Sequence, residues 1–224
     1  MRKEKGACYI CGKTATTTEH VPPKCFFPEK KDIGDVKDYR QQLITIPSCN
    51  EHNLKKSKDD EYAWFIIVSH FQNVSVAQTH SNTKIARAML RNPILENLYK
   101  PHVPASVDGM ATIATIVDGK RFFNAMDHIS RGVYYHHFNT IYSGTLNILV
   151  PSFVYMDDPD CQGKNEQMNQ WEATSSEVLQ DYPIYGANPE IFHYQVVQSS
   201  QTQITALRLV FYSGFIVDVC MNGS

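Results

Sequence analysis

Two pairs of potential metal ligands constrain the first part of this chain more than any other feature. They are Cys8-x-x-Cys11 and Cys49-x-x-His52. Two residues between ligands allow a tight turn to present both side chains to one ion, and zinc accepts Cys thiolates and His nitrogens in a tetrahedral set. We therefore expect a structural Zn²⁺ site made of Cys8, Cys11, Cys49 and His52. Cys25 lies between the pairs and could replace His52 as the fourth ligand.

An acidic residue and a histidine, Glu19 and His20, are adjacent between the two pairs, and Asn53 directly follows the second pair. Carboxylate and amide oxygens suit Mg²⁺, and a neutral imidazole can accept a proton from water. Neighbouring side chains in a strand point to opposite faces, so Glu19 and His20 need a bend to share one site. Pro22 and Pro23 favour such a bend. These groups supply what metal-assisted phosphodiester hydrolysis needs.

The order of these residues resembles that of the HNH endonuclease family, which has a ββα-metal fold, and in particular its zinc-bearing subgroup. The resemblance covers residues 8–61 and includes Glu19-His20-Val21-Pro22-Pro23, the segment 42–49 and His52-Asn53. Uncharacterised bacterial HNH proteins of similar length also resemble this stretch. The resemblance implies that His20 is the general base and that Glu19 and Asn53 bind a catalytic Mg²⁺ or Mn²⁺.

Three positions depart from the family pattern. Glu19 stands where Asp is usual, so the divalent ion must accommodate one more methylene group. Gln42 stands where the middle Asn is usual, which weakens the expected backbone brace of the catalytic histidine. His52 stands where the last Cys is usual, which zinc tolerates. All three keep a group of the required kind, and Gln42 stays among the expected catalytic residues.

The distribution of charge bears on the partner. The chain has 224 residues and a formal net charge of −2, which argues against general nucleic-acid binding. Residues 1–60, however, carry 12 Lys and Arg against 9 Asp and Glu, and the rest of the chain carries 9 against 14. Lys55 and Lys56 follow Asn53 closely, and we expect them to contact phosphates. The alternative for these two lysines is a solvated helix face.

The location expected from the sequence is the cytoplasm. The chain has no run of 18 apolar residues, so no membrane span is expected. The first ten residues, MRKEKGACYI, are charged and lack the apolar core of a secretory signal. Cysteines in metal-type pairs favour a reducing compartment over a disulfide scaffold.

The pattern of apolar residues predicts an α+β fold in two parts, an HNH module over residues 1–78 and an accessory α+β domain over 79–224. Apolar periodicity over 120–137, with Phe122, Met126, Ile129 and Val133 in one stripe, predicts the clearest helix. Other expected helices are 62–71, 83–90, 92–99 and 165–179, and expected strands are 42–46, 110–117 and 145–153. Segments 26–41 and 72–82 are polar and are expected to be a surface loop and a turn. Segments 191–197, 203–211 and 215–220 predict an antiparallel meander.

Two functional hypotheses follow. The first is a metal-dependent endonuclease that hydrolyses phosphodiester bonds, with DNA as the expected substrate. The alternative is a zinc-stapled module that binds nucleic acid or protein without cleaving it. A role as a toxin or phage-defence effector is plausible by analogy only. The C-terminal part could support the module, select substrate or form a homodimer, and the sequence does not choose among these.

Overall fold

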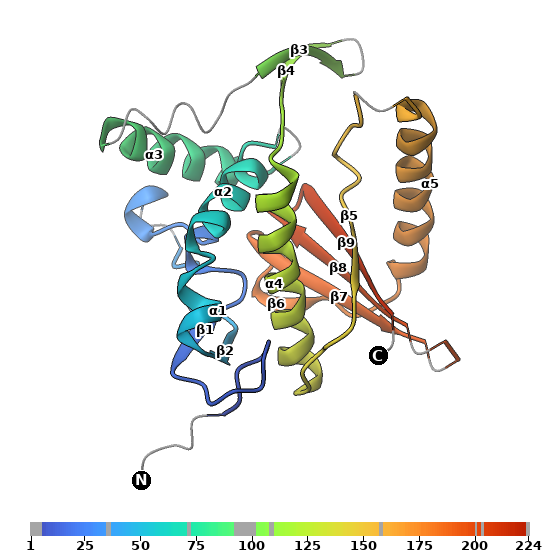
Figure 1. Ribbon diagram of the computed structural model, residues 1–224. Helices are drawn as coiled ribbons and strands as arrows, with labels where there is room; N and C mark the ends of the chain where they lie inside the picture. Colours follow the sequence, from blue (N-terminus) through green and yellow to red (C-terminus); the bar gives the residue numbers. More distant parts are fainter. Residues whose placement is uncertain are drawn as a thin grey trace.

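The chain folds as an α+β structure in which a small N-terminal unit and a five-stranded antiparallel sheet share a core (Figure 1). The computed structural model describes residues 6–34, 37–70, 73–91, 102–107, 110–156, 159–199, 201–202 and 204–222. The helices are η1 (Lys24–Phe26), η2 (Lys30–Asp32), α1 (Asn50–Leu54), α2 (Ser57–Val68), α3 (Ser75–Arg91), α4 (Gly119–Phe138) and α5 (Cys161–Leu179). The strands are β1 (Thr17–His20), β2 (Thr45–Ser48), β3 (His102–Val107), β4 (Met110–Thr115), β5 (Leu146–Leu149), β6 (Tyr185–Asn188), β7 (Phe192–Gln198), β8 (Thr205–Phe211) and β9 (Phe215–Met221).

The N-terminal unit is built on the antiparallel pair β1 and β2, in which Thr17 lies opposite Ser48 and His20 lies opposite Thr45. Cys49 is in an extended conformation and directly precedes α1, so the chain passes from strand to helix at a candidate zinc ligand. Two residues separate α1 from α2, and α2 buries apolar side chains on most of its surface. A helix that is apolar on several faces must lie inside a fold, and this one packs against α4.

α4 connects the N-terminal unit to the sheet. The predicted stripe of Phe122, Met126, Ile129 and Val133 is confirmed, since all four side chains are at most 1% exposed. Gly132 allows the helix to approach the β1–β2 end of the unit closely. A Cβ atom at this position would lie 2.7 Å from the Val21 side chain and 3.0 Å from that of Ile46. The absence of a side chain therefore sets the depth at which α4 lies on the hairpin.

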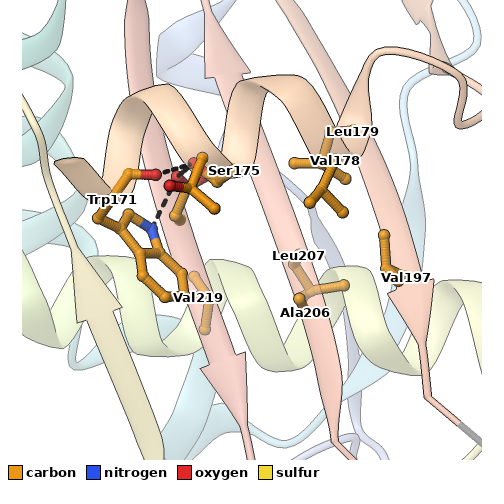
Figure 2. A pocket seen from close by; sticks show the side chains of 10 residues that line it. Trp171, Ser175, Val178, Leu179, Val197, Ala206, Leu207 and Val219 are labelled. Carbon is orange, nitrogen blue, oxygen red and sulfur yellow. Dashed lines mark hydrogen bonds between the residues drawn. The ribbon is translucent and has the colours of Figure 1, made fainter. Parts of the chain in front are cut away.

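The sheet has the strand order β5-β9-β8-β7-β6, and its neighbouring strands are antiparallel. β7, β8 and β9 form the meander predicted from the sequence. Successive side chains on a strand point to opposite faces. Phe211 accordingly packs against Phe26 and Phe215 against Phe122 of α4, while Arg208 points to the other side and binds α5. α4 and α5 therefore cover opposite faces of the sheet (Figures 1 and 2).

Polar contacts hold α5 on the sheet. Trp171 Nε1 and Ser175 Oγ both donate hydrogen bonds to Asp218, at 3.1 and 3.0 Å. Arg208 forms a buried ion pair with Asp218 at 2.7 Å and donates to the Ser176 hydroxyl at 2.8 Å. Beside this network lies a cavity of about 160 Å³ (Figure 2). Most of its lining is apolar and comes from both layers: Trp171, Val178, Leu179, Val197, Ala206, Leu207 and Val219.

Several local expectations were wrong because distant contacts decide the outcome. Segment 26–41 is not a surface loop: it contains η2, and it buries Phe26, Phe27 and Tyr39. Segment 72–82 is not a turn, because α3 begins at Ser75 and buries Ala77 and His80 in spite of its polar sequence. The strand β3 was not predicted at all. The helix expected over 92–99 lies outside the described residues.

The expected boundary at residue 78 falls inside α3. Buried side chains on both sides of it, from Cys8 to Met221, belong to one cluster. Within the described part of the chain, the structure contains no helix that is both long and apolar enough to cross a membrane.

Candidate metal centre and neighbouring hairpin

The four predicted zinc ligands lie together. One ligand atom from each of Cys8, Cys11, Cys49 and His52 falls within 4.8 Å of all the others. The sulfur atoms of Cys11 and Cys49 are 4.0 Å apart, and His52 Nδ1 is 3.2 Å from the Cys49 sulfur and 3.6 Å from that of Cys8. Zn–S bonds of about 2.3 Å place two tetrahedral sulfur ligands about 3.8 Å apart. The group can therefore hold a metal ion such as zinc.

The backbone of the turn that carries Cys8 and Cys11 favours the thiolate form of a ligand. Gly12 adopts a φ of 70°, where a residue without a Cβ is least strained, and its N–H donates to the Cys8 carbonyl at 3.0 Å. Burial raises the pKa of Cys8, but hydrogen bonds from backbone amides of the turn and of Cys49, together with one from His52, lower it to about 6. The turn thus favours the thiolate, which is the form that binds metal.

Cys25 does not compete for this site. Its sulfur lies 3.9 Å from the backbone carbonyl oxygen of Asp60, and it is not a member of the four-residue group. Burial raises the pKa of the Cys25 thiol to about 12. A thiol that resists ionisation is a poor zinc ligand, so His52 is the fourth member of the group.

Asn53 ties α1 to β1. Its amide nitrogen donates to the Thr17 hydroxyl at 3.0 Å and to the Thr18 carbonyl at 3.4 Å. Both contacts engage the nitrogen, so the amide oxygen is the atom that could bind a cation. The residue next to a zinc ligand is thereby held against the strand that ends in Glu19 and His20.

Glu19 is buried in an ion pair. Its Oε1 lies 2.6 Å from Lys56 Nζ, and the two side chains are 5% and 3% exposed. Lys56 also donates to both oxygens of Asp60, at 2.9 and 2.7 Å. Burial lowers the pKa of Lys56, but the carboxylates of Asp60 and Glu19 raise it above its ordinary value, so the ammonium group stays charged.

This arrangement bears on the two lysines expected to contact phosphates. Lys56 points inward, so its ammonium group is not on the surface where such a contact requires it. The prediction therefore does not hold for Lys56 in this structure. Lys55 is exposed and pairs with Glu51 at 3.1 Å, in the solvated arrangement that was the alternative.

His20 is the last residue of β1 and is partly exposed. The bend expected at Glu19-His20 does not occur there, because both residues lie in the strand and the chain turns only after His20. Their side chains therefore point to opposite faces of the hairpin. Burial lowers the pKa of His20, as do the nearby Lys24 and Arg40, although Glu19 raises it. The imidazole is thus held in its neutral, basic form at neutral pH.

Gln42 lies in the turn before β2, with a φ of 53°, and its side chain is exposed. The strand expected over 42–46 begins only at Thr45, because this left-handed residue interrupts the extended chain. Val21 N–H donates to the Ile44 carbonyl at 3.0 Å, so the pairing with the first arm continues between the turn and β2. Gln42 therefore occupies the expected position in the order of the HNH-like motif, but it does not lie in the strand where it was expected.

Two residues that the sequence did not single out border the site. His128 of α4 lies with its ring centroid 6.3 Å from that of His52, and its Nδ1 is 2.9 Å from the Asn124 carbonyl. Tyr9, inside the first metal turn, is fully buried near Glu19, whose charge adds to burial in raising the pKa of the phenol. His128 adjoins Ile129 of the apolar stripe, which was the only available signal of its inward position.

The site thus combines a closed metal-ligand group with a hairpin whose carboxylate and imidazole lie on different faces. A metal ion held by all four ligands would have no open position for a substrate. The chemistry available to the hairpin is proton transfer at His20 and cation binding by oxygen atoms of Glu19 and Asn53. In comparisons with known proteins, no family model, no curated protein and no solved structure matches this chain.

Proposed function

We propose that this protein is a metal-dependent endonuclease that hydrolyses phosphodiester bonds in nucleic acid, with DNA as its substrate. The observation that carries the proposal is the position of Asn53. It directly follows the zinc-type ligand His52 and is hydrogen-bonded to β1, the strand that ends in Glu19 and His20. The metal-ligand group therefore holds Asn53 against the strand that carries Glu19 and His20, and these are the three residues to which we assign the active site.

His20 acts in this proposal as the general base. Its lowered pKa leaves the imidazole neutral at neutral pH, so that it can take a proton from the attacking water. Lys24 and Arg40, which contribute to that shift, place positive charge near His20, where a phosphate would bind, although Arg40 also pairs with Glu29 at 3.0 Å. The proposed site of proton transfer thus holds a neutral base near two cations, one of which is already paired.

Glu19 and Asn53 would hold the catalytic Mg²⁺ or Mn²⁺. A carboxylate and an amide oxygen are ligands that these ions accept, and Oε2 of Glu19 is buried near the Tyr9 phenol and is not paired with Lys56. When bound, the ion would neutralise charge on the phosphate and on the leaving oxygen. The donor set fits the ion in chemical type, although Oε1 of Glu19 is already paired with Lys56.

The test is a plasmid-nicking assay with Mg²⁺ or Mn²⁺, with and without EDTA. We expect the wild-type protein to nick DNA only with a divalent ion, and His20→Ala to lose activity by ~10²-fold or more while it keeps its zinc and its fold. His193→Ala, on β7, is the matched control and should remain active. Wild-type activity in His20→Ala, or no nicking by the wild-type protein, would overturn the proposal.

A second candidate is a non-catalytic, zinc-stapled module that binds nucleic acid or protein. The burial of Glu19 in its pair with Lys56 favours this alternative, because a satisfied carboxylate has less need of a divalent ion. It predicts that DNA is retained in a gel-shift experiment while neither Mg²⁺ nor Mn²⁺ supports nicking. Metal-dependent nicking that His20→Ala abolishes would exclude this second candidate.

A further inference from the structure

A buried cluster of charge lies between α1–α2 and the hairpin. It consists of two carboxylates, Glu19 and Asp60, and one ammonium group, that of Lys56. Lys56 Nζ lies 2.6 Å from Glu19 Oε1 and 2.7 Å from Asp60 Oδ2, and the three side chains are nearly inaccessible to solvent. One cation is thus shared between two anions in a medium where an unpaired charge is costly.

The cluster also contains two buried oxygen atoms, Glu19 Oε2 and the Tyr9 hydroxyl. Neither is in hydrogen-bonding geometry with another described residue, but Tyr9 is close enough to Glu19 for a side-chain hydrogen bond and the charge of that carboxylate to raise the pKa of the phenol, beyond the effect of burial. From α4, His128 lies near the cluster: burial lowers its pKa, the charge of Lys56 lowers it further, and the charge of Glu19 raises it. Buried polar groups are nearly always paired, so this carboxylate oxygen can accept a hydrogen bond from Tyr9 or bind a cation, whereas Oε1 is held by Lys56.

We propose that Lys56 is the resident cation of Glu19, and that a divalent ion binds Glu19 by displacing the Lys56 ammonium group. Lys56 then sets the affinity of the site for divalent ions. This inference rests on the proposed function, because it takes Glu19 to be the carboxylate that holds the catalytic ion. It deepens that proposal by naming the residue that competes with the ion.

The geometry makes the displacement feasible. Lys56 and Asp60 are four residues apart at the start of α2, and Lys56 binds both oxygens of Asp60. If Lys56 leaves Glu19, its ammonium group can turn toward solvent while it keeps one hydrogen bond to Asp60, so neither charge is left unpaired. The long, flexible lysine stem allows this exchange without movement of the helix backbone. Glu19 would meanwhile exchange one cation for another.

The test measures Mn²⁺ binding to the zinc-loaded full-length protein by isothermal titration calorimetry. Lys56→Met removes the competing charge but keeps a long apolar stem, and we expect it to bind Mn²⁺ at least tenfold more tightly than the wild-type protein. Lys58→Met, an exposed lysine of the same helix, is the control and should not differ from wild type. The double variant Glu19→Gln/Lys56→Met should lose the gain. Equal or weaker binding by Lys56→Met, or no binding by either protein, overturns the inference.

A second measurement does not depend on the folding of a variant. Because binding is reciprocal, saturating Mn²⁺ should expose Lys56 of the wild-type protein to acetylation by acetic anhydride. Mass spectrometry should show at least a fivefold rise in Lys56 acetylation, with exposed Lys55 and Lys58 as internal references. Unchanged protection of Lys56 overturns the inference. Plasmid nicking by the wild-type protein tests the endonuclease proposal separately. Nicking without competition by Lys56 would overturn only the present inference, and competition by Lys56 without nicking would overturn only the endonuclease proposal.

Discussion

His80 provides a sharp prediction, because its hydrogen bonds determine which of its nitrogens can be protonated. The Tyr212 hydroxyl donates to the Phe26 carbonyl and also lies 3.0 Å from His80 Nδ1 and 3.2 Å from Trp64 Nε1. Since the hydroxyl proton is donated to the Phe26 carbonyl, His80 Nδ1 must carry a hydrogen and donate it to the Tyr212 oxygen. Nε2 is then the basic nitrogen, and it is buried without a hydrogen-bond partner among the described residues.

A proton on Nε2 would be a buried charge without an acceptor. Burial, followed by the nearby Lys84, accordingly lowers the pKa of His80 to about 3. An unfolded histidine titrates near pH 6.5, so between pH 6.5 and about 3 the unfolded chain binds a proton that the folded chain does not. Stability from this residue is therefore complete above pH 6.5 and falls as the pH falls. From pH 7 to pH 5 the loss is about 2 kcal/mol.

The assay is urea unfolding of the wild-type protein and of His80→Gln at pH 7 and pH 5. Glutamine keeps an N–H donor for Tyr212 but does not titrate, and other pH effects, including any loss of zinc, affect both proteins. We expect the free energy of unfolding of the wild-type protein to fall by about 2 kcal/mol more than that of the variant. Equal losses in the two proteins would refute the reasoning and show that His80 accepts a proton in the folded state.

Two further perturbations test the metal centre and the approach of α4. Cys49→Ser should reduce the amount of bound zinc, as measured by mass spectrometry of the metal, and a hundredfold weaker affinity corresponds to about 2.7 kcal/mol of stability. Cys161→Ser is the control. A zinc content equal to wild type in Cys49→Ser would contradict the site. Gly132→Ala places a Cβ 2.7 Å from Val21 and 3.0 Å from Ile46, so overpacking should cost 1–3 kcal/mol against about 1 kcal/mol gained in helix propensity. Urea unfolding measures the net loss, which Val21→Ala should partly restore, and a more stable Gly132→Ala would contradict the close approach.

The parts of the fold that could be predicted from the sequence are those that short-range patterns determine. The stripe from Phe122 to Val133 predicted α4, and alternating segments predicted the meander that became β7, β8 and β9. The metal-ligand group was predictable for a similar reason. Two residues between ligands form a local turn, and the choice of ligands depends on chemistry rather than on the rest of the fold.

The sequence-based predictions were wrong where contacts between residues far apart in the chain decide the structure. α3 reads as polar, yet His80 is buried because Trp64 and Tyr212 surround it, and Tyr212 is far away in the chain. Phe26 lies in a segment with a polar composition, yet it packs against Phe211 of the sheet. Tertiary contacts of this kind override local propensity, and no spacing in the sequence records them.

The pair Glu19-His20 shows the same limit at the site itself. Adjacency in sequence suggested two groups that act together, but a strand sends neighbouring side chains to opposite faces, and both residues lie in β1. One face carries a partly exposed base beside Lys24 and Arg40, and the other carries a buried carboxylate beside Lys56. If the two faces serve one reaction, Glu19 must exchange its partner when the divalent ion binds. In the proposed reaction the motif supplies the residues that take part, whereas Lys56, which is absent from the motif, is the residue that we propose competes with the ion for the carboxylate.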